Sequence, residues 1–281
     1  MRVGLGVYLT ALRATAAAPT GPWNPAQLGA SLALWLDADD SSTITLNGSN
    51  VAQWSDKSGN DRHATQATAA NQPAYLATGF NGKPTLTWDG NDDAMLMSMS
   101  LPVTDLNLFA VADPNGVAQN SYIMDIANVR RIFATNGQMF SSSWLPAVAP
   151  ITTGGQRIYG FTTGPANQIV YSDGTAVSTI AAVPAAVVDG VVGLGNRNSG
   201  TAFGLNGEMS EVVFVSGTLS DTDRQRLEGY LAWKWGLAET LPNDHPYRVD
   251  GRLFGYGSYK ALSPLDSDLL VTSDGDVFIV Q

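Results

Sequence analysis

Residues 227–248 read LEGYLAWKWGLAETLPNDHPYR, and no other stretch decides as much about the fold. Ser220 before them is a suitable N-cap, and Asp223 three residues later completes a capping-box-like pair. Apolar residues then recur at helical spacing until Gly236, which can adopt the left-handed conformation that ends a helix. The sequence therefore predicts one short helix over 220–235, rich in aromatic residues, that covers a larger apolar body.

Short strand-like segments fill most of the chain before this helix. They are rich in β-branched and aromatic residues, and Gly, Asn, Asp or Pro bounds each of them. The segments are 32–36, 85–88, 106–112, 121–126, 157–162 and 209–215. Asp173-Gly174 lies between two further runs and is a strong hairpin signal. Many short strands with one late helix predict an all-β, antiparallel β-sandwich or jelly roll.

Several tryptophan- and aspartate-containing motifs occur in a characteristic order. They are Leu34-Trp35-Leu36-Asp37, Trp54-Ser55-Asp56-Lys57-Ser58-Gly59 and Trp88-Asp89-Gly90-Asn91, followed by the helix segment. In this order they resemble the laminin-G-like branch of the concanavalin A-like lectin/glucanase superfamily. The resemblance implies a concanavalin A-like jelly roll over 28–248. It leaves 1–27 as an N-terminal arm and linker, and 249–281 as a C-terminal extension with a β-hairpin.

Composition excludes several classes of protein. The 15 basic and 25 acidic residues give a net charge of −10, and no basic run occurs, so no nucleic-acid partner is expected. The absence of cysteine excludes a disulfide framework and a thiolate metal site. No apolar run approaches the roughly 20 residues of a membrane-spanning helix. A charged content of 14% with 29 glycines fits a turn-rich sandwich.

No catalytic residue is predicted. The glucanase relatives carry alternating carboxylates on one strand, and the nearest candidates here are Glu208 and Glu211. These are three residues apart, so a regular strand would send them to opposite faces. A glycosidase needs two carboxyl groups about 5 Å or roughly 6.5–9.5 Å apart. His63 and His245 lack an accompanying nucleophile elbow or zinc-binding partner. The expectation is a protein without enzymatic activity.

Two loops provide candidate ligand-binding residues. Trp144 lies in a Ser/Pro loop and could stack on a sugar ring. Asn196, Arg197 and Asn198 offer amides and a guanidinium to sugar hydroxyls. The alternative is that these loops are rich in Asn and Gly for backbone reasons alone.

Clustered acidic residues are the candidates for a cation site. Asp89, Asn91 and Asp92 offer the oxygen groups that calcium prefers. Their spacing matches no known calcium loop, and Asp and Asn also cap turns through nearby backbone N–H groups. Turn capping is the favoured interpretation, so no cofactor is expected.

The two ends of the chain are predicted to mediate assembly. An arm that orders its backbone without a core of its own must bury its side chains against another surface. Arg13 closes the first apolar run early, which favours a retained arm over a signal peptide. An isolated hairpin near the C-terminus has the same need for a partner surface. The candidate assembly residues are Val3, Leu5, Val7, Leu9, Leu12, Val277 and Ile279.

The resemblance also sets the expected function. The Gly-rich start of residues 1–6 looks like that of phage structural proteins. We therefore expect a non-enzymatic, homo-oligomeric fibre, spike or head-decoration protein on the exterior of a tailed-phage virion. Its lectin-like domain would attach to host-surface glycan, and its ends would contact other virion proteins. The alternatives are a secreted or surface-bound bacterial carbohydrate-binding module and a divergent polysaccharide hydrolase.

Overall fold

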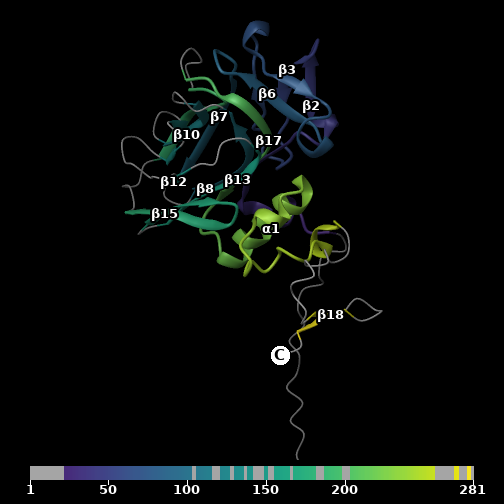
Figure 1. Ribbon diagram of the computed structural model, residues 1–281. Coiled ribbons are helices and arrows are strands. Elements are labelled where there is room, and N and C mark those ends of the chain that lie inside the picture. The colour runs from purple at the N-terminus through teal and green to yellow at the C-terminus, as the bar shows by residue number, and fades with distance from the viewer. Residues whose placement is uncertain are drawn as a thin grey trace, which may run out of the picture.

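The computed structural model describes residues 22–102, 106–115, 121–126, 130–135, 138–141, 149–150, 155–164, 167–181, 187–197, 203–256, 269–271 and 277–279. These residues form an antiparallel β-sandwich with one α-helix packed on it (Figure 1), which confirms the predicted fold class. The strands of the sandwich are β1 Leu32–Asp37, β2 Ile44–Asn47, β3 Asn50–Trp54, β4 Ala64–Thr65, β5 Ala74–Leu76, β6 Thr85–Asp89, β7 Met95–Pro102, β8 Leu106–Pro114, β9 Ser121–Ile126, β10 Arg130–Thr135, β11 Gln138–Ser141, β12 Ala149–Pro150, β13 Arg157–Thr163, β14 Asn167–Ser172, β15 Thr175–Ala181, β16 Val187–Leu194 and β17 Asn206–Ser216.

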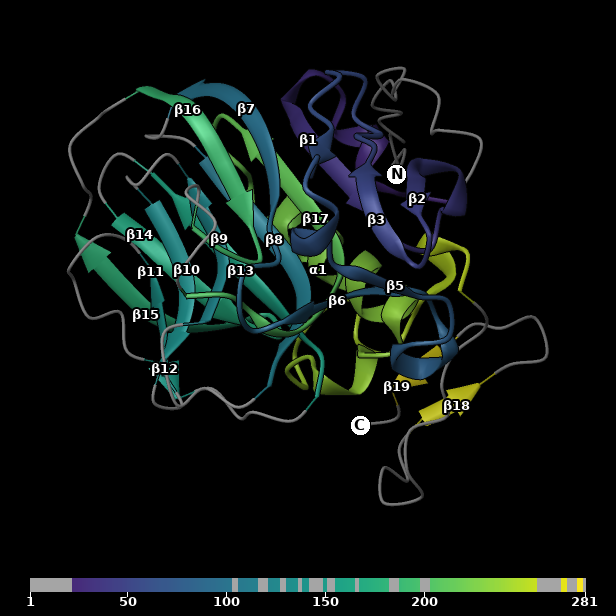
Figure 2. The ribbon, with the colours of Figure 1, turned by 90° about the horizontal axis from the view of Figure 1, so that it is seen from above.

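Hydrogen-bonded pairing arranges most of these strands in two layers. In the first layer β17 pairs with β8, which continues through β13 and β14 to β15, while β1 and β6 share the other edge of β17. The second layer runs from β7 through β16, β9, β10 and β11 to β12. Figure 2 shows β2 and β3 at one side of the body and β14 and β15 at the other.

The main core lies between the layers, and a second core lies under the helix. On β8, Leu108 and Ala110 point into the main core, whereas Phe109 and Val111 point toward the helix. This alternation is what a pleated strand dictates. Strand β1 is buried along its whole length because its side chains enter both cores: Leu34 and Leu36 lie in the main core, and Trp35 lies in the second. Its apolar run predicts this burial.

Helix α1, Asp221–Trp235, begins and ends where its local signals predict. The Ser220 hydroxyl accepts a hydrogen bond from the Asp223 N–H at 3.1 Å, and Gly236 takes a left-handed conformation with φ of 72°. The helix packs over β8 and β17 (Figure 1), burying Leu227, Leu231 and other side chains in the second core. The predicted lid over an apolar body is confirmed.

The two predicted hairpins are also present. Asp173 and Gly174 both have positive φ, 48° and 78°, and join β14 to β15 in the left-handed turn that suits such a connection. Near the C-terminus β18, Leu269–Val271, pairs antiparallel with β19, Val277–Ile279, as a separate two-stranded sheet. The assembly residues proposed between Val3 and Leu12 lie outside the described residues, so their role stays a prediction.

Segments on both sides of the predicted sandwich bounds pack onto the helix. Trp23 is only 6% exposed; its ring lies 6.1 Å from that of Tyr230 and 6.0 Å from that of Phe254. Its backbone N–H donates to the Leu253 carbonyl at 2.7 Å. Residues 22–27 and 249–256 therefore contribute to the second core. Among the described residues, no helix has the length and apolarity needed to span a membrane.

Candidate functional site

An irregularity in β17 determines where its two glutamates point. Glu208 lies opposite Asp113 and Glu211 lies opposite Val111, with a register shift at Ser210 between them. Asp113 and Val111 are two residues apart on β8, so they share a face, and so do the residues paired with them. Both glutamates therefore point toward the helix side. The expectation of opposite faces is wrong, because a bulge adds one residue to the spacing.

Glu211 is completely buried and holds the helix to the sheet. Its carboxylate accepts hydrogen bonds from the indole N–H groups of Trp35 and Trp235, each at 2.7 Å, and from the Tyr230 hydroxyl at 3.1 Å. The Lys234 ammonium lies 2.8 Å away. Burial raises the pKa of Glu211, whereas all four groups donate to its lone pairs and so act in favour of the ionised carboxylate. This occupancy leaves Glu211 unable to attack a substrate.

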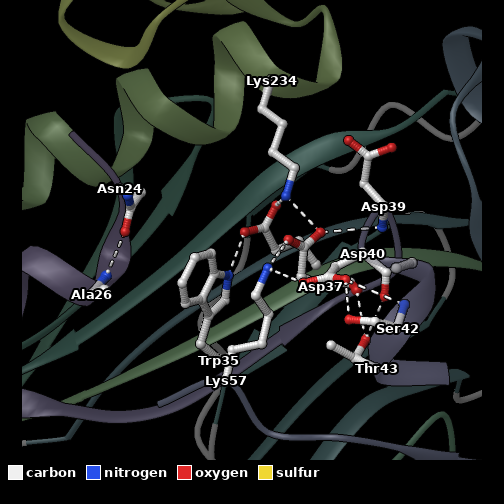
Figure 3. Close-up of polar contacts among 12 residues, drawn as sticks. Asn24, Ala26, Trp35, Asp37, Asp39, Asp40, Ser42, Thr43, Lys57 and Lys234 are labelled. Carbon is white, nitrogen blue, oxygen red and sulfur yellow. Dashed lines mark hydrogen bonds and ion pairs between the residues drawn. The ribbon is translucent and has the colours of Figure 1, made fainter. Parts of the chain in front are cut away.

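The network extends from Lys234 to the edge of the sheet (Figure 3). Lys234 contacts Asp37 at 2.5 Å, and the other oxygen of Asp37 accepts from Lys57 at 2.8 Å. Lys57 also bridges to Asp40 at 2.8 Å and lies 4.3 Å above the Trp35 ring. We call Glu211, Lys234, Asp37, Lys57 and Asp40 the charge network.

Burial and neighbouring charge have opposite effects on the pKa of Lys234. Burial alone would lower the pKa of Lys234, but the charges of Glu211 and Asp37 outweigh it and raise that pKa. Hydrogen bonds from Lys57 and from Ser42 hold the pKa of Asp40 below its usual value. Against the effect of burial, the charges of Asp37 and Asp40 raise the pKa of Lys57 as well, so both lysines stay charged across the physiological pH range.

A cavity of about 480 Å³ opens above this network. Its lining includes Asp37, Lys57 and Lys234 of the charge network. Its other lining residues are Pro22, Trp23, Asn24, Trp35, Asp39, Asp40, Ser41, Tyr230, Phe254 and Tyr256. We call it the helix-side cavity. Its size falls within the range of small-molecule sites, but its accessible lining is more polar than is usual for them.

The charge balance of this cavity limits what it can bind. Asp39 pairs with Lys83 at 2.7 Å, so the region holds four carboxylates against three ammonium groups. One net negative charge disfavours an anionic ligand. The cavity offers carboxylate acceptors, an ammonium donor and the hydroxyl of Ser41, which are groups that can bond the hydroxyls of a neutral ligand.

A second cavity, also of about 480 Å³, lies along β7 and β16. It is lined by Ser98, Met99, Ser100, Gly190 and Val191. None of these five residues is aromatic or charged. It therefore offers a sugar ring less than the helix-side cavity does.

The structure brings two of the sequence candidates, Asn196 and Asn91, into contact at one end of the sandwich. Asn196 is fully buried, and its amide donates to the carbonyls of Asn91 and Asp93 at 3.3 and 3.4 Å. Asn196 therefore fastens a loop. Arg197 is partly exposed, and its guanidinium lies 5.5 Å from the centre of the Phe203 ring. Phe203, which sequence reasoning missed, is 37% exposed and gives this end an accessible aromatic surface.

The acidic turn, residues 89–93, is held together by its own hydrogen bonds. The Asp89 carboxylate accepts from the backbone N–H and the side-chain amide of Asn91, at 2.8 and 3.0 Å. This is the turn capping that the sequence favours. Carboxylate oxygens of Asp89, Asp92 and Asp93 also lie within 4.8 Å of one another. Burial, with the charges of Asp89 and Asp92, raises the pKa of Asp93 to about 6.

The remaining candidates have simple placements. Trp144 and Asn198 lie outside the described residues. The Nδ1 atom of His63 accepts from the Asp56 N–H at 3.1 Å, and His245 lies 3.3 Å from a Glu228 oxygen. Both histidines thus contact groups that hold local structure.

Comparison with known proteins gives relatives in fold only. No family model matches the sequence, and no curated protein matches it. Domain 4 of AbnA, an extracellular arabinanase from Geobacillus stearothermophilus solved with arabinotriose, aligns with a TM-score of 0.52 and 16% identity, over 70% of this chain and 98% of that domain.

Two longer chains are also similar in structure. The binding domain of Paraclostridial Mosquitocidal Protein 1 aligns with a TM-score of 0.52 and 12% identity, over 73% of this chain and 53% of that one. An arabinofuranosidase solved with arabinofuranosyl-α-1,2-xylobiose gives 0.50 and 15%, over 64% and 50%. This chain spans about half the length of each. At such identities the likeness shows the fold alone, a β-sandwich compatible with a concanavalin-like fold.

Proposed function

We propose that this chain is a non-enzymatic, laminin-G-like domain that binds carbohydrate and is displayed on a tailed-phage virion. The helix-side cavity carries the binding part of the proposal. Asp39 and Asp40, whose side chains are partly exposed, and the exposed Ser41 line this cavity, and their oxygens can bond the hydroxyls of a sugar. The structural similarity to an arabinanase domain that was solved with arabinotriose supports the same class of ligand.

The charge network argues against a glycosidase that uses Glu208 and Glu211 as its carboxyl pair. A retaining or inverting mechanism needs two carboxyl groups that both reach the substrate. Glu208 and Glu211 share a face, but Glu211 is fully buried and spends its oxygens on four donors. A polysaccharide screen should therefore detect no release of reducing sugar. Turnover that disappears in Glu208→Gln would overturn this part of the proposal.

Binding is tested with a panel of neutral and acidic oligosaccharides and isothermal titration calorimetry. Asp39→Asn and Ser41→Ala remove an acceptor and a hydroxyl at the cavity, and both should weaken binding of a neutral sugar. Arg197→Ala changes the loop end and serves as the comparison. Loss of binding only in Arg197→Ala would move the site to the loops, and no binding to any member would refute the proposal.

The virion setting is the furthest step of the proposal. Its supports are the resemblance of the first residues to phage structural proteins and the separate sheet of β18 and β19. A two-stranded sheet is marginal by itself in water, so it suits addition to a neighbouring subunit. Mass spectrometry of purified particles should find this chain. Its absence from particles would leave a secreted or surface carbohydrate-binding module as the function.

A further inference from the structure

A row of oxygen-bearing side chains crosses the helix-side face of the first layer, away from the charge network. Glu208 on β17 lies opposite Thr87 on β6 and, on its other side, opposite Asp113 on β8. Directly opposed residues of antiparallel strands have Cβ atoms about 4.5–5.5 Å apart, so these side chains are neighbours. Two like charges in this position repel, which gives the sheet a cost that something must offset.

Gln156 completes the row. Arg157 pairs with Ala112, which places Gln156 beside Asp113 on the far side of β8. Its amide nitrogen nevertheless donates to the Ser210 hydroxyl on β17, so the side chain crosses over β8. Gln156 is only 3% exposed. The four residues that we call the oxygen row are Thr87, Glu208, Asp113 and Gln156.

Three oxygens of this row lack hydrogen-bond partners among the described residues. Asp113 Oδ1, Gln156 Oε1 and Thr87 Oγ1 are shielded from solvent, and none makes a hydrogen bond there. A buried polar atom without a partner destabilises the fold, so three of them on neighbouring strands call for an explanation. Burial raises the pKa of Glu208, and the charge of Asp113 raises it further. No cationic side chain contributes to that shift.

We propose that the oxygen row binds a hard divalent cation of the calcium class. Two carboxylates, one amide carbonyl and one hydroxyl are the donor types that such a cation prefers, at about 2.3–2.6 Å. A bound cation would give the unpartnered oxygens a ligand and cancel the repulsion between Glu208 and Asp113. The site is separate from the acidic turn, whose Asp89 oxygens are already used in capping hydrogen bonds.

The experiment uses the full chain after treatment with EDTA. Calcium chloride is added in a calorimetric titration and in thermal unfolding, and terbium luminescence provides a second readout. The parent should bind one calcium ion at the row and gain thermal stability. Asp113→Asn and Glu208→Gln should each lose both effects, while Asp92→Asn in the acidic turn should retain them.

Loss of calcium binding must be separated from loss of structure. In EDTA, Asp113→Asn and Glu208→Gln should unfold at or above the temperature of the parent, since each removes a repulsion. The proposal is overturned if calcium leaves the parent unchanged, which would favour a proton shared by the two carboxyls. It is also overturned if Asp92→Asn abolishes the response while Asp113→Asn preserves it.

Discussion

The side chain of Glu211 connects helix α1 to the sheet, so its replacement should destabilise the fold. In Glu211→Gln the amide would present N–H groups to indole and hydroxyl donors, and Lys234 would lose one of its two carboxylates. Breaking a buried ion pair from one side typically costs about 3–5 kcal/mol, and we expect a loss of that size. Urea unfolding measures it.

Asp250→Asn is the matched control for this change. Asp250 and Arg252 form an ion pair at 3.0 Å with side chains 31% and 48% exposed. Pairs of this kind contribute about 0–1 kcal/mol. Similar losses in Glu211→Gln and Asp250→Asn would contradict the anchoring role of Glu211.

Asp93 should make stability depend on pH. Its folded pKa of about 6 lies above the unfolded value near 3.9, so the folded state binds the proton more tightly. Stability therefore falls as the pH rises from about 4 through 6. Asp93→Asn removes the charge, so it should melt higher than the parent at pH 8 in EDTA and equally at pH 4. A constant difference at both pH values would refute the assignment.

Residue-level prediction succeeded where the cause is local and failed where it is distant. Capping by Asp89 follows from its neighbours in sequence. Trp23 looked like a free linker residue because its partners, Tyr230 and Phe254, come more than 200 residues later. The charge network was missed, although a lysine between two tryptophans on a covering helix needs a carboxylate partner.

At the level of elements, helix α1 and about half of the strands of the sandwich were predicted from capping, turn and alternation signals, whereas β7 and β16, for example, were not. The bulge at Ser210 was not predicted either, because only pairing with β8 shows that an extra residue is present. Because of that extra residue, Glu208 and Glu211 lie on the same face, whereas the sequence alone predicts opposite faces. Register is a property of two strands, and one strand's sequence does not contain it.

The turn after β16 gives a test at this scale. Gly195 and Gly48 both have positive φ, 74° and 66°. A Cβ at Gly195 would overlap the buried indole of Trp88, whereas one at Gly48 would meet nothing within 4 Å. Gly48→Ala should cost about 1–2 kcal/mol of backbone strain. Gly195→Ala should cost about 1–3 kcal/mol more, from overpacking. Equal losses in chemical denaturation would contradict the packing argument.

At the scale of the whole molecule, the boundaries of the folding unit can be tested by truncation. Deleting residues 1–22 leaves Trp23 and should give a folded, soluble domain that no longer enters particles. Deleting residues 1–27 also removes Trp23 from the second core and the Asn24 cap of the turn that follows it, at Pro25–Ser31. The longer deletion should lower the melting temperature clearly. Identical melting curves would show that Trp23 contributes nothing.

The location of Pro22 and Tyr256 has a practical consequence. Both residues line the helix-side cavity, so the chain enters and leaves the sandwich body beside its mouth. In a shortened chain that begins at Pro22, a purification tag, fused fluorophore or surface tether at the N-terminus would start beside the cavity and compete sterically with the proposed saccharide. Affinities measured on immobilised protein should therefore depend on where it is attached. Coupling through the β2–β3 turn at Gly48, which is not among the residues that line the cavity, avoids this interference.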